Sequence, residues 1–197
     1  AVLEILNFGY NEIADIEPYA FNNLSNLGGL GLMGNKLSRV TKNVFSVPTL
    51  KILNLLDNKI TLNESQAFHG LHLLSLDLSG NKLTTLKKSS FLGCTVEELY
   101  IRRNETASIE PNLFADMSSL RKLDLSYNKL NKIDRNVIRP STLKVLNMYH
   151  LPKLSVYDFE QISNLTQLGV TEPTHKLYDF LVYLIYFKEK RPGLQRI

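Results

Sequence analysis

Histidines are the residues of this chain best suited to metal or acid–base chemistry, and the sequence has four. His69 and His72 are close in sequence, but no third ligand follows at a spacing that would hold zinc. His150 could lie near Asp124 and Tyr127 in the fold. A nucleophilic triad also needs an activated serine, however, and no serine suits that role. A glycine-rich loop for phosphate is also missing. The sequence therefore predicts no metal site, no cofactor and no enzymatic activity.

A second group of residues is suited to binding. Tyrosine and arginine are the side chains that most often anchor protein interfaces, and several of them fall between residues 100 and 150. The predicted partner-binding patch consists of Tyr100, Arg102, Arg103, Asp124, Tyr127, Asn147, Tyr149 and His150. The alternative interpretation is an ordinary polar sheet face that binds nothing.

A recurring asparagine identifies the elements that must position these side chains. The asparagines are separated by 23 or 24 residues, which is a period typical of a solenoid. A buried asparagine must satisfy both its carbonyl and its amide, and one asparagine per coil can bond the backbone of neighbouring loops. The predicted structural ladder consists of Asn11, Asn35, Asn58, Asn81, Asn104 and Asn128.

The residues around each asparagine follow a fixed frame, best seen in Leu120-x-x-Leu123-x-Leu125-x-x-Asn128-x-Leu130. The Leu-x-Leu part has the period of a strand, so each coil contributes one short strand with one apolar face. Phenylalanines also recur at one register and predict an aromatic spine under the convex side. They are Phe21, Phe45, Phe68, Phe91 and Phe114.

This frame resembles the leucine-rich repeat family, of the kind with about 24 residues per repeat. The resemblance implies an α/β-type solenoid: a horseshoe with a parallel β-sheet on its concave face and an irregular or 3-10 helical convex side. His69 and His72 would then lie on the convex side. The patch from Tyr100 to His150 would lie on the concave face, where such proteins hold a protein ligand or co-receptor.

The chain divides into repeats and a C-terminal segment. Residues 1–172 are predicted to form about seven to eight coils. In the seventh coil Leu151 replaces the ladder asparagine, and residues 165–170 fit the strand of an eighth coil. Residues 173–197 are predicted to cap the last coil, with a helix favoured and a strand left open. A membrane-surface or partner helix is the alternative. The repeats start at Leu3, so we expect a fragment of a longer protein or an unusual cap.

Asparagine and cysteine usage bear on the compartment. Asn63, Asn23 and Asn164 each begin an Asn-x-Ser/Thr triplet and are predicted glycosylation sites, which favours a secreted or extracellular protein. Asn104 begins the same triplet, but a buried ladder residue cannot carry a sugar. Cys94 is the only cysteine, so no disulfide forms within the chain. We interpret it as a small core residue, the alternatives being a reactive thiol or a disulfide between chains.

Charge and the family resemblance limit the partners. The net charge is +4, but lysine and arginine are dispersed, which does not favour nucleic acid. No stretch of about 20 apolar residues is present, so membrane association would require segments absent from this chain. The repeats are similar to those of Toll-like receptor ectodomains and of secreted leucine-rich immune proteins of insects. This resemblance implies a recognition module of innate immunity, with dimerisation possible. The alternatives are a matrix or adhesion protein and an intracellular scaffold.

Overall fold

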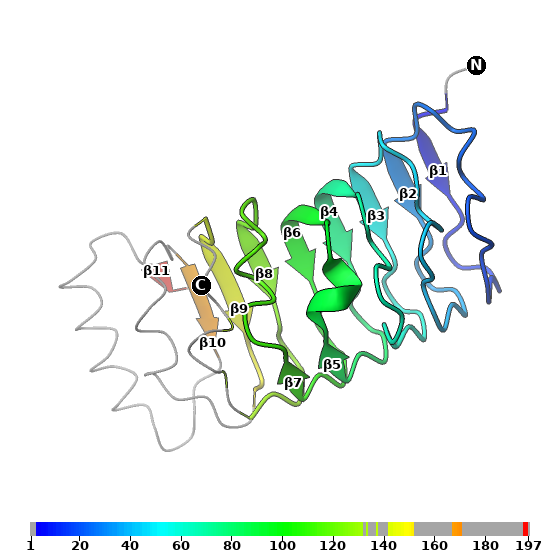
Figure 1. The fold of residues 1–197 in the computed structure, drawn as a ribbon. Helices are drawn as coiled ribbons and strands as arrows, with labels where there is room; N and C mark the ends of the chain where they lie inside the picture. Colours follow the sequence, from blue (N-terminus) through cyan, green and yellow to red (C-terminus); the bar gives the residue numbers. More distant parts are fainter. Residues whose placement is uncertain are drawn as a thin grey trace, which may run out of the picture.

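The computed structural model describes residues 3–131, 133, 137 and 142–151, together with the backbone of 167–170 and 195–196. The chain winds into a solenoid in which successive coils add strands to one parallel sheet (Figure 1). In spatial order the strands are β1 (Ile5–Asn7), β2 (Gly29–Gly31), β3 (Ile52–Asn54), β4 (His72–Asp77), β6 (Thr95–Tyr100), β8 (Lys122–Asp124), β9 (Val145–Met148), β10 (Gln167–Val170) and β11 (Gln195–Arg196). This arrangement confirms the predicted solenoid with its parallel sheet.

The opposite side of each coil has little regular structure. Two short strands, β5 (Thr85–Leu86) and β7 (Ser108–Ile109), pair in parallel there, and η1 (Lys88–Phe91) is a 3-10 helix. No α-helix occurs in the part of the chain that the structure describes, so the irregular convex side is also confirmed. The placement of His72 on that side is wrong: β4 begins one residue before the leucine frame, and His72 starts this strand.

The leucines of adjacent strands pair in register. Leu76 lies opposite Leu53 on one side and Leu99 on the other, and the same register continues through Leu123 to Leu146. Each of these side chains is at most 1% exposed. Because side chains alternate between the two faces of a strand, a shift of the strand pairing by one residue would expose the whole row of leucines to solvent. Burial of the leucine row therefore fixes which residues face outward.

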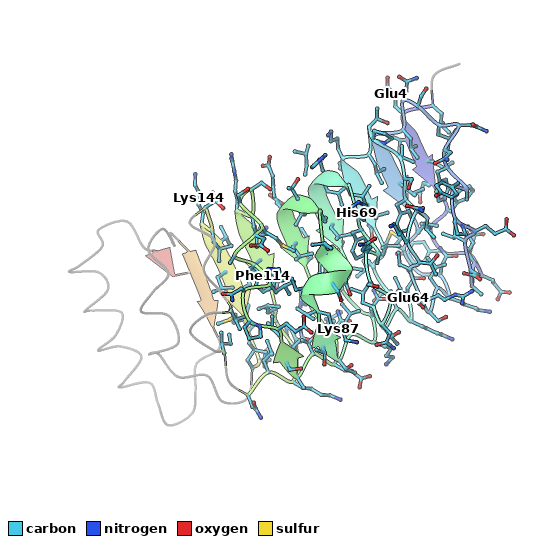
Figure 2. All side chains as sticks on the ribbon, in the orientation of Figure 1. Glu4, Glu64, His69, Lys87, Phe114 and Lys144 are labelled. Atoms are coloured by element: carbon cyan, nitrogen blue, oxygen red, sulfur yellow. The ribbon has the colours of Figure 1, made fainter. Side chains whose placement is uncertain are left out.

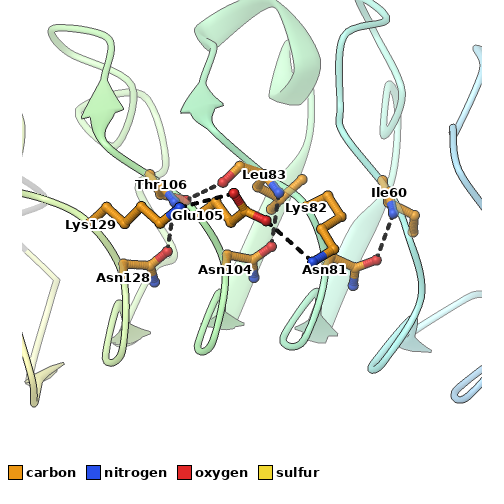
Figure 3. Close-up of polar contacts among 9 residues, drawn as sticks. All are labelled: Ile60, Asn81, Lys82, Leu83, Asn104, Glu105, Thr106, Asn128 and Lys129. Carbon is orange, nitrogen blue, oxygen red and sulfur yellow. Dashed lines mark hydrogen bonds and ion pairs between the residues drawn. The ribbon is translucent and has the colours of Figure 1, made fainter.

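The ladder asparagines tie each coil to the one before it (Figure 3). Asn81 donates from Nδ2 to the carbonyl of Leu78 in its own coil and to that of Leu55 in the preceding coil, both at 3.0 Å. Its Oδ1 accepts the N–H of Ile60 at 2.9 Å. Equivalent bonds are made by Asn35, Asn58, Asn104 and Asn128. Asn11, in the first coil, is exposed and bonds only within its own coil.

The phenylalanine row and Cys94 fill the interior behind the sheet. The five phenylalanines are at most 7% exposed, and Phe68 stacks on Phe91 with ring centroids 5.4 Å apart. Figure 2 shows Phe114 inside the stack, whereas Lys144 lies at its outer edge. Cys94 is 5% exposed, and burial raises the pKa of its thiol to about 12. Since the thiolate is the reactive form, Cys94 serves as a core side chain.

The two ends of the stack differ from its middle. Leu3 and Phe8 are 42% and 37% exposed, whereas Leu27 and Leu32, at the same register one coil later, are fully buried. At the other end β11 pairs in parallel with β10, an addition to the sheet that the sequence pattern does not predict. The predicted helical cap in residues 173–197 lies outside the described residues, apart from this short strand.

The ladder can be tested by comparing Asn81→Ala with Asn11→Ala. Asn81→Ala is expected to lower the free energy of unfolding by about 3 kcal/mol, because it leaves buried carbonyl and N–H groups of two coils without partners. Asn11→Ala should lower it by less than about 1 kcal/mol, since its partners reach water. Urea denaturation measures both values. Equal losses would contradict a stabilising role that depends on contacts between coils.

Candidate functional site

Three adjacent strands bring predicted binding residues side by side. Tyr100 of β6 pairs with Asp124 of β8, and Asp124 pairs with Asn147 of β9. All three alternate with buried leucines, so their side chains point away from the leucine core. Residues separated by 23 or 24 positions in sequence thus become neighbours on the outer face of the sheet.

Two residues beside Tyr100 also belong to this surface. The Tyr100 hydroxyl donates to Oε2 of Glu98 at 2.5 Å, and Nζ of Lys122 lies 5.1 Å from the centre of the Tyr100 ring. Burial and the hydrogen bond to Glu98 raise the pKa of Tyr100, and the charge of Lys122 opposes them. Glu98 and Lys122 were not among the predicted binding residues. The two-residue period of the strand could have identified them, since each lies two positions before a residue that it selected.

Asp124 and Asn147 are partly committed to the fold. Asp124 is 9% exposed, and its Oδ1 accepts the N–H of Ser126 at 2.9 Å. Asn54 and Asp77 make the same bond to the residue two positions later, so this side chain ends each strand with a local turn. Asn147 donates to Asp124 Oδ2 at 3.4 Å, and its own Oδ1 is buried without a hydrogen-bond partner among the described residues.

The residue just before each ladder position has a left-handed backbone. In coil order these residues are Tyr10, Gly34, Asp57, Gly80, Arg103, Tyr127 and His150, with φ between 52° and 65°. Glycine adopts this conformation without strain, and asparagine tolerates it, but a bulky side chain does not favour it. The first coil nevertheless places Tyr10 there, and three consecutive later coils place arginine, tyrosine and histidine there.

These side chains form a stack around Tyr127. The guanidinium carbons of Arg102 and Arg103, both from the preceding coil, lie 4.8 and 5.8 Å from the centre of the Tyr127 ring. The His150 ring, from the following coil, lies 4.3 Å from it. These distances are typical of cation–π and aromatic contacts. Arginines, tyrosine and histidine therefore cover one continuous area over three coils.

The remaining predicted residues have separate positions. Tyr149 is half-buried, and its N–H donates to Oγ of Ser126 at 3.2 Å. Asn63 and Asn23 are exposed, whereas Asn104 is 6% exposed and bonded within the ladder. Asn164 lies outside the described residues.

The described residues contain no group of three histidine, cysteine or acidic side chains that could hold a metal ion. Among the same residues, no helix has the length and apolar character needed to cross a membrane.

The architecture is that of a repeat scaffold, and comparison with known proteins identifies the family. The leucine-rich repeat model matches residues 25–83, 48–104 and 94–150, so the chain belongs to the leucine-rich repeat family. Leucine-rich repeat domains generally act as recognition scaffolds that bind other proteins. A comparison with curated proteins finds no match.

Several solved structures share the fold. They include the leucine-rich repeat domain of APL1B (23% identity, TM-score 0.65), the Leptospira interrogans leucine-rich repeat protein LIC12759 (23%, 0.63) and TLR13 in complex with ssRNA13 (24%, 0.60). The matches cover 84%, 84% and 88% of this chain. The chain spans only 47%, 48% and 29% of those proteins, and at such identities the likeness concerns the fold alone.

The environment of Tyr100 predicts how its ionisation responds to Glu98. Glu98→Gln should lower the pKa of Tyr100 part of the way to its ordinary value, because a carboxylate that raises it is removed while burial remains. In the wild type the raised pKa contributes stability below the unfolded-state pKa, and this is lost as pH rises through the folded value. NMR titration of tyrosine Cζ, assigned with Tyr100→Phe, measures the shift. Glu97→Gln is the control, and an equal shift there would contradict the assignment.

Proposed function

We propose that this protein is a non-enzymatic recognition module that binds a protein partner through the concave face of its later repeats, in the coils of β6, β8 and β9. The binding surface, called the recognition patch below, consists of Tyr100, Arg102, Arg103, Asp124, Tyr127, Asn147, Tyr149 and His150. Tyrosine and arginine combine apolar contact area with polar groups, which suits them to anchor an interface. No cofactor takes part in this function.

The left-handed position before each ladder residue carries the proposal. Gly34 and Gly80 satisfy the backbone there, whereas Arg103 and Tyr127 hold it against the preference of a bulky residue, and His150 is of a type found there more often. All three occur in consecutive coils and contact one another through Tyr127. Tyr10 has the same backbone in the first coil, so it is the contact of these three side chains in consecutive coils, rather than the backbone alone, that supports a binding surface.

We further propose that the protein acts in a secreted or extracellular setting in innate immunity. The exposed acceptor triplets at Asn63 and Asn23 support the compartment. The resemblance to Toll-like receptor and insect immune repeats supports the role. A protein ligand or co-receptor is the proposed partner, and a second copy of the chain is a further partner compatible with this surface.

Tyr127→Asn tests the recognition patch. Asparagine accepts the left-handed backbone, so the folded state should persist with a melting temperature within about 3 °C of the wild type. Loss of the ring that Arg102 and His150 contact should weaken partner retention about tenfold or more. The measurement is quantitative mass spectrometry of proteins retained from extracellular fluid by immobilised wild type and variant.

Tyr10→Asn is the matched control, because Tyr10 has the same backbone conformation in the first coil, far from the patch. The expected result is a protein retained by wild type and Tyr10→Asn but lost with Tyr127→Asn. Identical retained proteins for both variants would contradict binding at the patch.

Glycosylation tests the compartment separately. The natural protein should lose mass on enzymatic deglycosylation, with glycans at Asn63 and Asn23, whose side chains are exposed. Asn104 provides an internal control: it has the same triplet, but its amide is buried in the ladder and should carry no glycan. Intact-mass and peptide mass spectrometry measure both. An unchanged mass would contradict a secretory route.

A further inference from the structure

Two arginines of the recognition patch differ from the other described arginines. Arg39 lies 2.7 Å from Asp15, and Arg121 lies 3.7 Å from Glu97, so each has a carboxylate partner. Arg102 and Arg103 form no ion pair with any residue that the structure describes; both are instead placed against the ring of Tyr127. Two adjacent positive charges without a counter-charge raise the local positive potential.

Arg102 is held by packing rather than by hydrogen bonds. It is half-buried, and its Nε is buried with no acceptor among the described residues. A guanidinium carries five N–H donors in a planar fork that matches the two oxygens of a carboxylate. Contact with the Tyr127 ring orients this fork before any ligand arrives, which reduces the entropy lost on binding.

We infer that Arg102 and Arg103 form an anchor for a carboxylate side chain, supplied by an acidic segment of the protein partner. This inference rests on the proposed function, because it names the chemistry by which the recognition patch holds that partner. One or two carboxylates bound here would neutralise the unpaired arginine charges. Tyr127 and His150 would provide the aromatic wall beside them.

Acidic residues on the neighbouring coils limit the anchor to a short anionic group. Glu98 lies two residues before Tyr100, and Asp77 occupies the same register as Tyr100 one strand earlier. The Asp57 carboxylate also lies close to Gly80, which belongs to the coil before that of Arg103. A Cβ placed on Gly80 would be 2.0 Å from Oδ1 of Asp57. A long polyanion following the sheet would be repelled by these carboxylates, whereas an acidic side chain contacts only the arginines.

The anchor can be tested by NMR with N-acetyl-diglutamate amide as the probe. The Nε–Hε signals of Arg102 and Arg103 should shift saturably as the probe is added, and the apparent Kd should rise with salt. The signals of Arg39 and Arg121, which already have carboxylate partners, should remain in place. Arg102→Gln and Arg103→Gln should each weaken probe binding about tenfold.

Arg121→Gln is the matched control, since it removes the same charge at the opposite end of the neighbouring strand and should change the apparent Kd less than about twofold. Absence of a saturable shift, or equal losses in all three variants, would overturn the anchor. Tighter binding of an oligo-dT or a sulfated oligosaccharide of equal charge to the same two arginines would also overturn it, in favour of a polyanion site. If retention of a protein partner still depends on Tyr127 when the probe fails, the proposed function stands without the carboxylate anchor.

Discussion

The asparagine side chain that bonds two coils at once is the constraint on which the structure depends. Each buried amide donates to carbonyls of its own coil and of the coil before it, while its oxygen accepts an N–H of the earlier coil. An amide has few alternatives in an apolar interior, where an unpaired group costs about 1–3 kcal/mol. The spacing and register of the coils are thereby fixed together. Residues one repeat apart in sequence must then lie side by side, and any surface function has to use rows that run across strands.

The repeat frame divides its residues between fold and surface, but the division is not sharp. The leucine row is buried, and the residues between the leucines face outward. Asp124 belongs to both groups: it faces outward by strand alternation, yet its carboxylate accepts the N–H of Ser126 and is nearly buried. Asn54 and Asp77 show that this is a general way to end a strand in this protein. Within the recognition patch, the side chains of the two arginines and of Tyr127 contact mainly one another and are the freest to bind a partner.

The strands, their parallel order and the ladder could be predicted because each depends on a buried group repeated at fixed spacing. The start of β4 at His72 and the pairing of β11 with β10 could not, since neither residue set follows the leucine frame. The outward orientation of Glu98 and Lys122 could also have been predicted, since side chains two positions apart on a strand point to the same face. The lack of a carboxylate partner for Arg102 among the described residues could not be predicted, because it depends on side-chain conformations: Glu98, near in sequence, accepts the hydrogen bond of the Tyr100 hydroxyl instead.

Several deviations from the local rules of the fold occur together in the coils of β6, β8 and β9. A large side chain occupies the left-handed position in each. Two arginines have no carboxylate partner in the described part of the chain, and both buried side-chain atoms without a partner there, Arg102 Nε and Asn147 Oδ1, lie in these coils. Folded proteins tend to retain such deviations where they serve a function. The second coil shows the contrast, because Gly34 satisfies the same backbone and leaves its space to the ring of Tyr10, which holds the left-handed backbone in the first coil. The repeat frame would accept glycine or asparagine in every coil, and the proposed recognition patch gives the arginine, tyrosine and histidine of three consecutive coils a role that the backbone does not require.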